Sequence, residues 1–129
     1  MNSIKKQLTA IALLLFTITT CAQIKNAKTT TVKILGNCGM CETNIEKAGN
    51  TKKVSQVDWN KDTKIATLKY DATLTTEDEI LKKIALAGYD SERFRAPDAV
   101  YENLHGCCQY ERETTSMPIP ASKLDLQTN

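Results

Sequence analysis

Hydrophobic and polar residues alternate along three segments of the chain, clearly in the first, loosely in the second and imperfectly in the third, with the period of two that half-buried strands require. These segments cover residues 29–35, 54–59 and 64–70. A further segment, residues 89–95, carries a weaker strand pattern and ends before Pro97. The pattern therefore predicts four strands.

Two other segments repeat hydrophobic residues at helical spacing. The first covers residues 41–48, and the second ends before Gly88. The second also begins with an N-terminal capping signature, in which Thr75 or Thr76 is followed by Glu79. The order strand, helix, strand, strand, helix, strand predicts an α+β fold. We expect a ferredoxin-like βαββαβ sandwich, with two helices on one face of a four-stranded antiparallel sheet, plus a C-terminal extension.

Residues 1–22 have the layout of a secretory signal peptide. Lys5 and Lys6 precede an apolar run at residues 8–18, and small residues lead to a cleavage position after Ala22. The run is shorter than the roughly 20 residues of a membrane-spanning helix, so an uncleaved anchor is the weaker interpretation. We expect cleavage, export to the periplasm or cell envelope, and no membrane span after processing.

Cys21 offers an alternative to simple cleavage. Residues 18–21 read ITTC, which is similar to the lipid-attachment box of bacterial lipoproteins, although Thr20 stands where that pattern prefers Gly, Ala or Ser. A lipid anchor on Cys21 therefore stays open. In either case residues 23–29 are expected to form a linker to the domain.

The charge balance argues against nucleic-acid binding. The whole chain has 17 basic and 15 acidic residues, a net charge of +2, and Lys5 and Lys6 lie in the predicted signal peptide. The rest of the chain is therefore balanced, whereas nucleic-acid binding usually needs a basic face. We expect no nucleic-acid partner.

Cys38 and Cys41 form a CxxC pair between the first predicted strand and the first predicted helix. The free N–H groups at the start of a helix favour a thiolate, which is the form that binds metal. Thiolates select soft ions such as Cu(I), and by the same argument Hg(II) or Ag(I), or Zn(II) with enough further ligands. A CxxC pair at a helix start is also the redox arrangement of thioredoxins.

The surroundings of this pair favour metal binding over thiol–disulfide exchange. No Trp precedes Cys38, and no proline lies between Cys38 and Ala96, where a thioredoxin fold would place one facing its CxxC pair. The predicted hairpin at residues 54–70 also follows the first helix directly, which is the wrong order for a thioredoxin core. A purely structural CxxC pair is a third, weaker interpretation.

The predicted extension, residues 96–112, contains a second cluster in which His105, Cys107 and Cys108 lie within four residues. Imidazole and thiolate are both metal ligands. The cluster could complete the CxxC site, form an independent site on a mobile arm, or consist of a surface histidine and a disulfide. The remaining residues, 113–129, have little hydrophobic pattern and are expected to form a flexible tail.

Residues 30–95 resemble a heavy-metal-associated domain, the small fold of copper chaperones and periplasmic mercuric-ion-binding proteins. The resemblance rests on "NCGMC" after the first strand, on "VSQVDWNKDTKIATLKYD" and on "ILKKIALAGYD". It implies a ferredoxin-like fold in which Cys38 and Cys41 bind a soft metal ion. It also implies that Tyr89 lies close to the site.

The chain departs from the family pattern at the metal loop. The family has the motif Gly-Met-x-Cys-x-x-Cys at this loop. This chain has Gly36-Asn37-Cys38, so its loop is one residue shorter before the first cysteine and lacks the Met. Met40, between the two cysteines, is a candidate to replace that Met near the site. The choice of metal is left open by this departure.

We therefore predict an exported soft-metal-binding protein that is not an enzyme. It would sequester or deliver Cu(I), or a similar thiophilic ion, through Cys38 and Cys41, with a metal transporter or efflux component as its partner. Two alternatives stay open: a periplasmic thiol–disulfide oxidoreductase that uses the same pair, and a zinc-stabilised interaction module that uses both pairs, Cys38 and Cys41 with Cys107 and Cys108.

Overall fold

The computed structural model describes residues 23–113 and the backbone of residues 119–120. The predicted signal peptide with Cys21, and residues 114–118 and 121–129 of the predicted tail, lie outside the described residues. Within the described part, no helix is both long and apolar enough to cross a bilayer.

Three antiparallel strands form one sheet in the order β1-β3-β2. They are β1 (Ala27–Lys33), β2 (Ser55–Trp59) and β3 (Ile65–Asp71). Buried and exposed residues alternate strictly along β2, as expected where only one face of a sheet is covered. The register places Val57 opposite Leu68, so two core side chains meet across the ladder. β1 starts at Ala27, so the end of the predicted linker at residues 23–29 belongs to the sheet.

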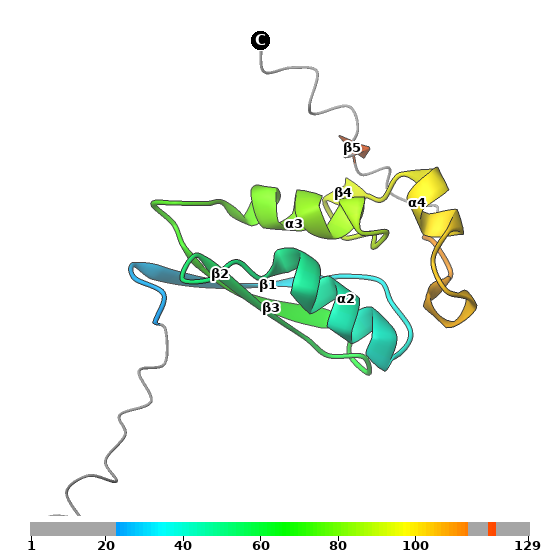
Figure 1. Ribbon diagram of the computed structural model, residues 1–129, viewed down its shortest axis with the longest axis horizontal. Coiled ribbons are helices and arrows are strands. Elements are labelled where there is room, and N and C mark those ends of the chain that lie inside the picture. The colour runs from blue at the N-terminus through cyan, green and yellow to red at the C-terminus, as the bar shows by residue number, and fades with distance from the viewer. Residues whose placement is uncertain (1–22, 114–118, 121–129) are drawn as a thin grey trace, which may run out of the picture.

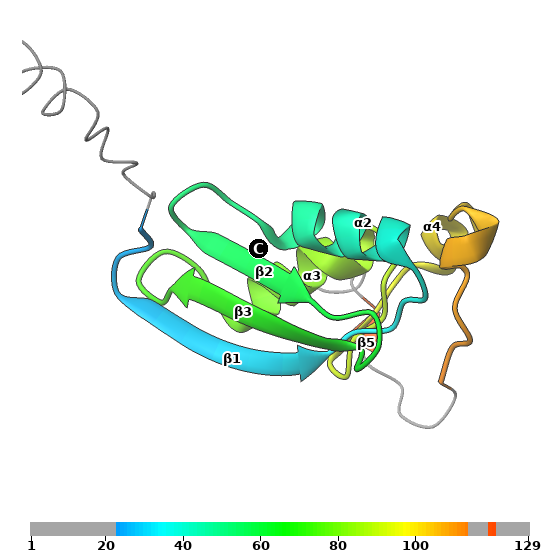
Figure 2. The same ribbon diagram turned by 90° about the horizontal axis from the view of Figure 1, so that it is seen from below.

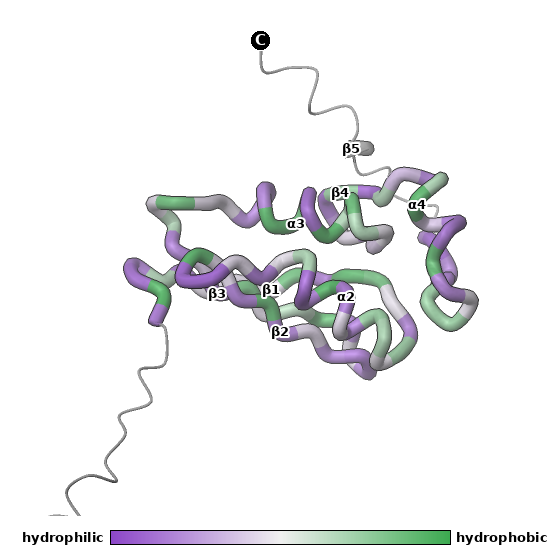
Figure 3. Tube along the Cα trace, viewed as in Figure 1, coloured by the Kyte–Doolittle hydropathy of each residue, from purple (hydrophilic) through white to green (hydrophobic). Residues whose placement is uncertain are grey.

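Two helices, α2 (Gly39–Gly49) and α3 (Glu77–Leu86), cover one face of this sheet (Figures 1 and 2). Figure 3 shows hydrophobic residues recurring along α3 between hydrophilic ones, as the helical spacing predicts. The core lies between the helices and the sheet, and Ile45, Leu68 and Ile84 are fully buried in it. The predicted α+β class with an antiparallel sheet is confirmed.

The capping signature of the second helix is present as predicted. The Thr76 hydroxyl accepts from the Glu79 N–H at 3.2 Å, and the Glu79 carboxylate accepts from the Thr76 N–H at 3.1 Å. The helix leads into a turn at Gly88, whose φ of +107° suits glycine. A Cβ at Gly88 would also lie 2.8 Å from the Leu104 side chain. The absence of a side chain at Gly88 therefore lets Leu104 of the extension pack closely against the domain.

The prediction of a fourth sheet strand at residues 89–95 is wrong. Only Phe94–Arg95 forms a strand, β4, and its partner is β5 (Ile119–Pro120). These two strands pair in parallel and form a separate two-stranded sheet. The main sheet therefore has three strands among the described residues instead of four.

A turn at Ser91 explains why the fourth strand does not extend. An isolated antiparallel bridge joins Ser91 to Ile34, at the edge of β1 where a fourth strand would lie. The Ser91 hydroxyl, however, accepts from the N–H groups of Arg93 and Phe94 at 3.3 and 3.1 Å. This local hydrogen bonding turns the chain away from β1, a common effect of serine side chains.

The extension folds back onto the domain. It contains α4 (Asp98–Glu102) and a short 3-10 turn, η1 (Gly106–Cys108), at the end of the molecule where α2 begins (Figures 1 and 2). Cys108 and Tyr110 belong to the same core cluster as the sheet and helix residues. The alternative of a mobile arm is therefore contradicted.

Candidate metal centre

The CxxC loop is held between the end of β1 and the start of α2. Ile34 is fully buried, and its carbonyl accepts from Trp59 Nε1 at 3.0 Å. Cys38 is the N-cap residue of α2, with an extended backbone (φ −136°, ψ 173°). The Asn37 N–H then donates to Cys41 Sγ at 3.3 Å. A buried indole and a helix start therefore fix the loop.

The two thiols of the CxxC pair differ in burial and in charge. Their Sγ atoms lie 3.5 Å apart, and Cys41 is fully buried while Cys38 is half-buried. The backbone N–H of Cys41 is the main cause that lowers the pKa of Cys38 to about 6, and the thiol of Cys107 contributes less. The Cys41 N–H does not reach ordinary cap geometry at the sulfur, so it favours the thiolate as one of the free N–H groups at the helix start. Cys38 is therefore a thiolate at neutral pH.

The second cysteine pair lies against the first. Cys38 Sγ is 3.4 Å from Cys107 Sγ and 3.8 Å from Cys108 Sγ. The Sγ atoms of Cys38, Cys41 and Cys108 all lie within 4.8 Å of one another. The four cysteines among the described residues are free thiols, so no disulfide joins the two pairs. The fold thus gathers thiols that are about 70 residues apart in the chain into one cluster, which we call the thiol cluster.

The other residues predicted near the site take different positions. Tyr89 is buried beside the cluster, its hydroxyl accepts from Asn44 Nδ2 at 3.0 Å, and burial raises its pKa. Met40 is 45% exposed, so it does not replace the missing core methionine. His105 is exposed before η1 and is not in the group of potential ligand atoms around Cys38.

An ion pair anchors the extension that carries the second pair. Arg112 Nε and Nη2 donate to the two carboxylate oxygens of Asp90 at 2.8 and 2.7 Å. The side chains of Arg112 and Asp90 are only 11% and 7% exposed. Asp90 also accepts from the Ala96 N–H at 2.7 Å, and Arg112 reaches the exposed Asp98 at 2.7 Å. A nearly buried, bidentate ion pair therefore links the end of the extension to the turn after α3.

Two tyrosines add to this anchor. The Tyr110 hydroxyl accepts from the Asp90 N–H and donates to the Gly88 carbonyl, both at 2.8 Å. Its ring packs edge-on against Tyr101 with centroids 5.0 Å apart and stacks at 6.2 Å on Tyr89. The sequence pattern does not predict the roles of Asp90, Tyr101, Tyr110 and Arg112. The one signal in the sequence is a pair of aromatic residues in an otherwise polar segment.

Cys107 and Cys108 lose their protons less readily than ordinary thiols. The contact with Cys38 raises the pKa of Cys107, and burial raises the pKa of Cys108 to about 12. The Cys38 thiolate therefore lies beside two thiols that resist ionisation, because burial and the nearby negative charge both disfavour a further thiolate. A cation would remove this repulsion, and its binding would release the remaining protons.

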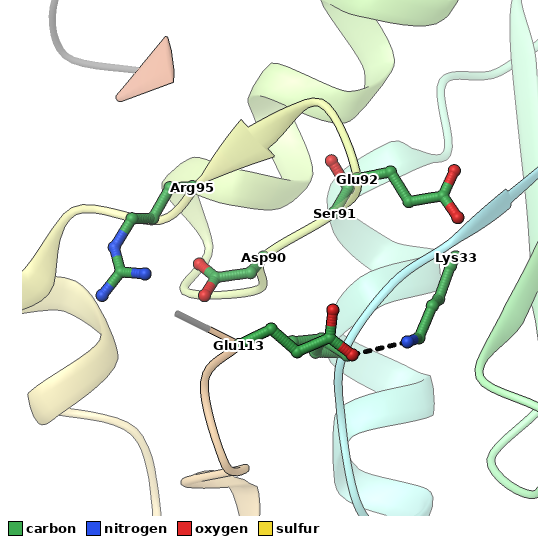
Figure 4. Close-up of a pocket in the computed structure, with 7 residues that line it drawn as sticks. Lys33, Asp90, Ser91, Glu92, Arg95 and Glu113 are labelled. Carbon is green, nitrogen blue, oxygen red and sulfur yellow. Dashed lines mark hydrogen bonds and ion pairs between the residues drawn. The ribbon is translucent and has the colours of Figure 1, made fainter. Parts of the chain in front are cut away.

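A separate pocket lies between the end of β1 and the turn at Ser91 (Figure 4). Lys33 and Glu113 form an ion pair there at 2.5 Å, and both side chains are partly exposed. The pocket is lined by charged and polar side chains together with Leu35, and it contains no thiol. It is therefore distinct from the thiol cluster.

Comparisons with known proteins add little to this geometry. No protein-family model matches the chain, and no curated protein matches it. A search of solved structures found a chain named CopZ metallochaperone, with 23% sequence identity and a TM-score of 0.47. The alignment covers 50% of this chain and 98% of that chain. The four clustered thiols are therefore the main evidence for function.

Proposed function

We propose that the protein binds a soft metal ion through the thiol groups of Cys38, Cys41 and Cys108. The observation that carries this proposal is their mutual proximity: the three Sγ atoms lie within 4.8 Å of one another as free thiols. Two of them are buried and the third is half-buried, so the cluster is partly shielded from water.

The spacing of the sulfurs suits a single ion. Metal–sulfur bonds of about 2.3 Å place sulfurs about 4.0 Å apart around a trigonal ion and about 3.8 Å apart around a tetrahedral one. The measured separations from Cys38 Sγ, 3.5 Å to Cys41 and 3.8 Å to Cys108, need only small adjustments. Soft thiolate sulfur favours Cu(I), and Hg(II), Ag(I) and Zn(II) are the other candidates.

We propose a carrier role, in which the metal is cargo rather than a cofactor of an enzyme. Cys38 is half-buried and Cys107 exposed, so sulfur ligands of a partner could reach the cluster at this side. A metal transporter or efflux component with its own thiols would be the partner, since cargo passes between such sites by exchange of one ligand at a time.

The test is a competitive Cu(I) titration of the reduced protein against a chromogenic chelator. We expect one Cu(I) per chain, with binding weakened most in Cys38→Ser and clearly weakened in Cys41→Ser. Met40→Leu is the matched control, because it removes an exposed sulfur between the two ligands and should bind as the unchanged chain does. Wild-type affinity in both serine variants would refute the proposal.

One observation favours a second candidate, thiol–disulfide exchange. Its basis is the pKa of Cys38, lowered to about 6 by the Cys41 N–H, because an accessible thiolate is also what a redox nucleophile needs. Reduction of insulin disulfides by the protein, abolished in Cys38→Ser, would favour this candidate. Tightly held zinc that is lost only on unfolding would instead favour the zinc-stabilised interaction module.

Export is a further part of the proposal. Its support is the charged start, apolar run and small residues of residues 1–22, which have the layout of a signal peptide. An alkaline phosphatase fusion after residue 29 should be active in a bacterial host, because that reporter needs an oxidising compartment. Substituting charged residues into residues 8–18 should abolish the activity.

A further inference from the structure

The thiol cluster contains two overlapping sets of three sulfurs. The first set is Cys38, Cys41 and Cys108, with all Sγ atoms within 4.8 Å of one another. The second set is Cys38, Cys107 and Cys108, with separations of 3.4, 3.8 and 3.9 Å. Cys38 and Cys108 belong to both sets, and the sets differ in one member only.

The sulfur that is unique to the first set is buried, and the sulfur that is unique to the second set is exposed. Cys41 is fully buried, next to the loop and the core, whereas Cys107 is exposed on η1. The first set is therefore an inner position and the second an outer position. An ion can move between the inner and outer positions by exchanging one ligand while it stays bound to the sulfurs of Cys38 and Cys108.

We infer that Cys107 is an entry and exit ligand, so that a soft monovalent ion such as Cu(I) passes through the outer position on its way to and from the inner one. This inference rests on the proposed soft-metal function. It assigns Cys107 a role in the rate of transfer, and it assigns Cys41 a role in retaining the ion.

The exchange step balances in charge and in bonds. The bond from the ion to Cys41 sulfur forms while the bond to Cys107 sulfur breaks. Cys41 loses its proton and the Cys107 thiolate gains one, so the net charge of the cluster is unchanged. Cys38 and Cys108 stay bound throughout, which avoids a state in which the ion has only one ligand.

This arrangement makes a sharp kinetic prediction. Because a path used for entry is also used for exit, removing Cys107 must slow uptake and release by the same factor. The equilibrium dissociation constant is the ratio of the two rates, and it depends on the inner position alone. We expect Cys107→Ser to slow both rates by about tenfold or more and to change the dissociation constant by less than about threefold.

The experiment follows Cu(I) transfer between the reduced full-length protein and a chromogenic chelator by stopped flow, beside an equilibrium competition. Cys107 is exposed, so Cys107→Ser should fold as the unchanged chain does, and circular dichroism checks this. Cys108→Ser is the matched variant: it disrupts both sets and should weaken equilibrium binding. Cys41→Ser leaves the outer set and should bind more weakly and release faster.

Three results would overturn the inference. The first is unchanged transfer rates in Cys107→Ser. The second is an equilibrium loss in Cys107→Ser as large as that in Cys108→Ser, which would make all four sulfurs permanent ligands. The third is two Cu(I) ions bound at once, which would make the positions separate sites. Failure of the unchanged protein to bind any Cu(I) would instead refute the proposed function.

Discussion

The two cysteine pairs reach the same cluster by different physical means. Cys38 and Cys41 are placed by their neighbours in sequence, at the junction between β1 and α2 and against the buried Trp59. Cys107 and Cys108 come about 70 residues later in the sequence, on the short 3-10 turn η1 of the extension. The first pair is part of the domain's secondary structure, whereas the second depends on tertiary contacts.

Those tertiary contacts combine packing of Tyr110 and Cys108 into the core with a few buried polar links. The Asp90–Arg112 ion pair and the Tyr110 hydroxyl link the extension to the turn after α3. Removing one partner of such a contact is costly, because the other partner is left buried and unpaired. We therefore expect that a single substitution at these polar links loosens the second pair and leaves the first pair in place.

Replacing Asp90 should have the largest effect on this comparison. Asp90→Ala removes the buried acceptor of Arg112 and of the Ala96 N–H, while Arg112 keeps its contacts with Asp98 and the Ala96 carbonyl. We therefore expect a loss of about 3 kcal/mol in the free energy of unfolding. Urea denaturation measures this loss. Amide hydrogen exchange should rise across residues 98–113 more than in the three-stranded sheet.

The matched control for this prediction is Asp98→Ala. Asp98 also contacts Arg112, but its side chain is 74% exposed, so we expect a loss of only about 0–1 kcal/mol. Equal losses in the two variants would mean that the extension does not depend on the buried half of the anchor.

Removing the Tyr110 hydroxyl should have a smaller effect in the same direction. Tyr110→Phe leaves the Asp90 N–H and the Gly88 carbonyl without their partner, at a cost of about 1–3 kcal/mol. Urea denaturation again gives the stability. Labelling of Cys108 by a thiol reagent should become faster, while labelling of Cys41 should not. Parallel acceleration at both cysteines would indicate general unfolding instead of release of the extension.

The two pairs should also differ in chemical reactivity. At pH 7 the Cys38 thiol, with its pKa lowered to about 6, is mostly thiolate, whereas the pKa of Cys107 is raised by its contact with Cys38. We expect iodoacetamide to alkylate Cys38 at least about tenfold faster, although Cys107 is the more exposed. Peptide mass spectrometry measures both rates.

The pH dependence of alkylation sharpens this test. The rate at Cys38 should fall as the pH drops through about 6, because the thiolate becomes protonated. The rate at Cys107 should increase only in alkaline solution. In urea the two rates should become similar, and a difference that persists there would point to local sequence instead of the fold.

The smallest expected effect concerns Glu79 in the capping box of α3, which belongs to neither cysteine pair. Hydrogen bonds from the Thr75 hydroxyl and the Thr76 N–H lower the pKa of Glu79. A lowered pKa stabilises the fold fully above the ordinary Glu value of 4.5, and this stabilisation is lost as the pH falls through the folded value. Glu79→Gln should therefore show a shallower loss of stability in acid, by urea denaturation. Alkylation of the cysteines at pH 7 should stay the same.

Much of the domain could be predicted from local patterns. Alternation along β2, helical spacing in α3 and the Thr76–Glu79 capping box all depend on residues close together in the chain. The position of Cys38 and Cys41 at a strand–helix junction follows from the same patterns. Local patterns failed at residues 89–95, because the Ser91 side chain hydrogen-bonds the neighbouring backbone and turns the chain.

The sequence by itself determined the order of strands and helices, the CxxC pair and the thiolate-favouring helix start. Only the tertiary structure decided that Cys107 and Cys108 join that pair. The physical reason is that Asp90 and Arg112 are 22 residues apart, and neither residue type nor spacing indicates that they meet. Their contact requires the turn at Gly88 and lies beside the buried Tyr110, so it belongs to the packed domain and not to any segment of it.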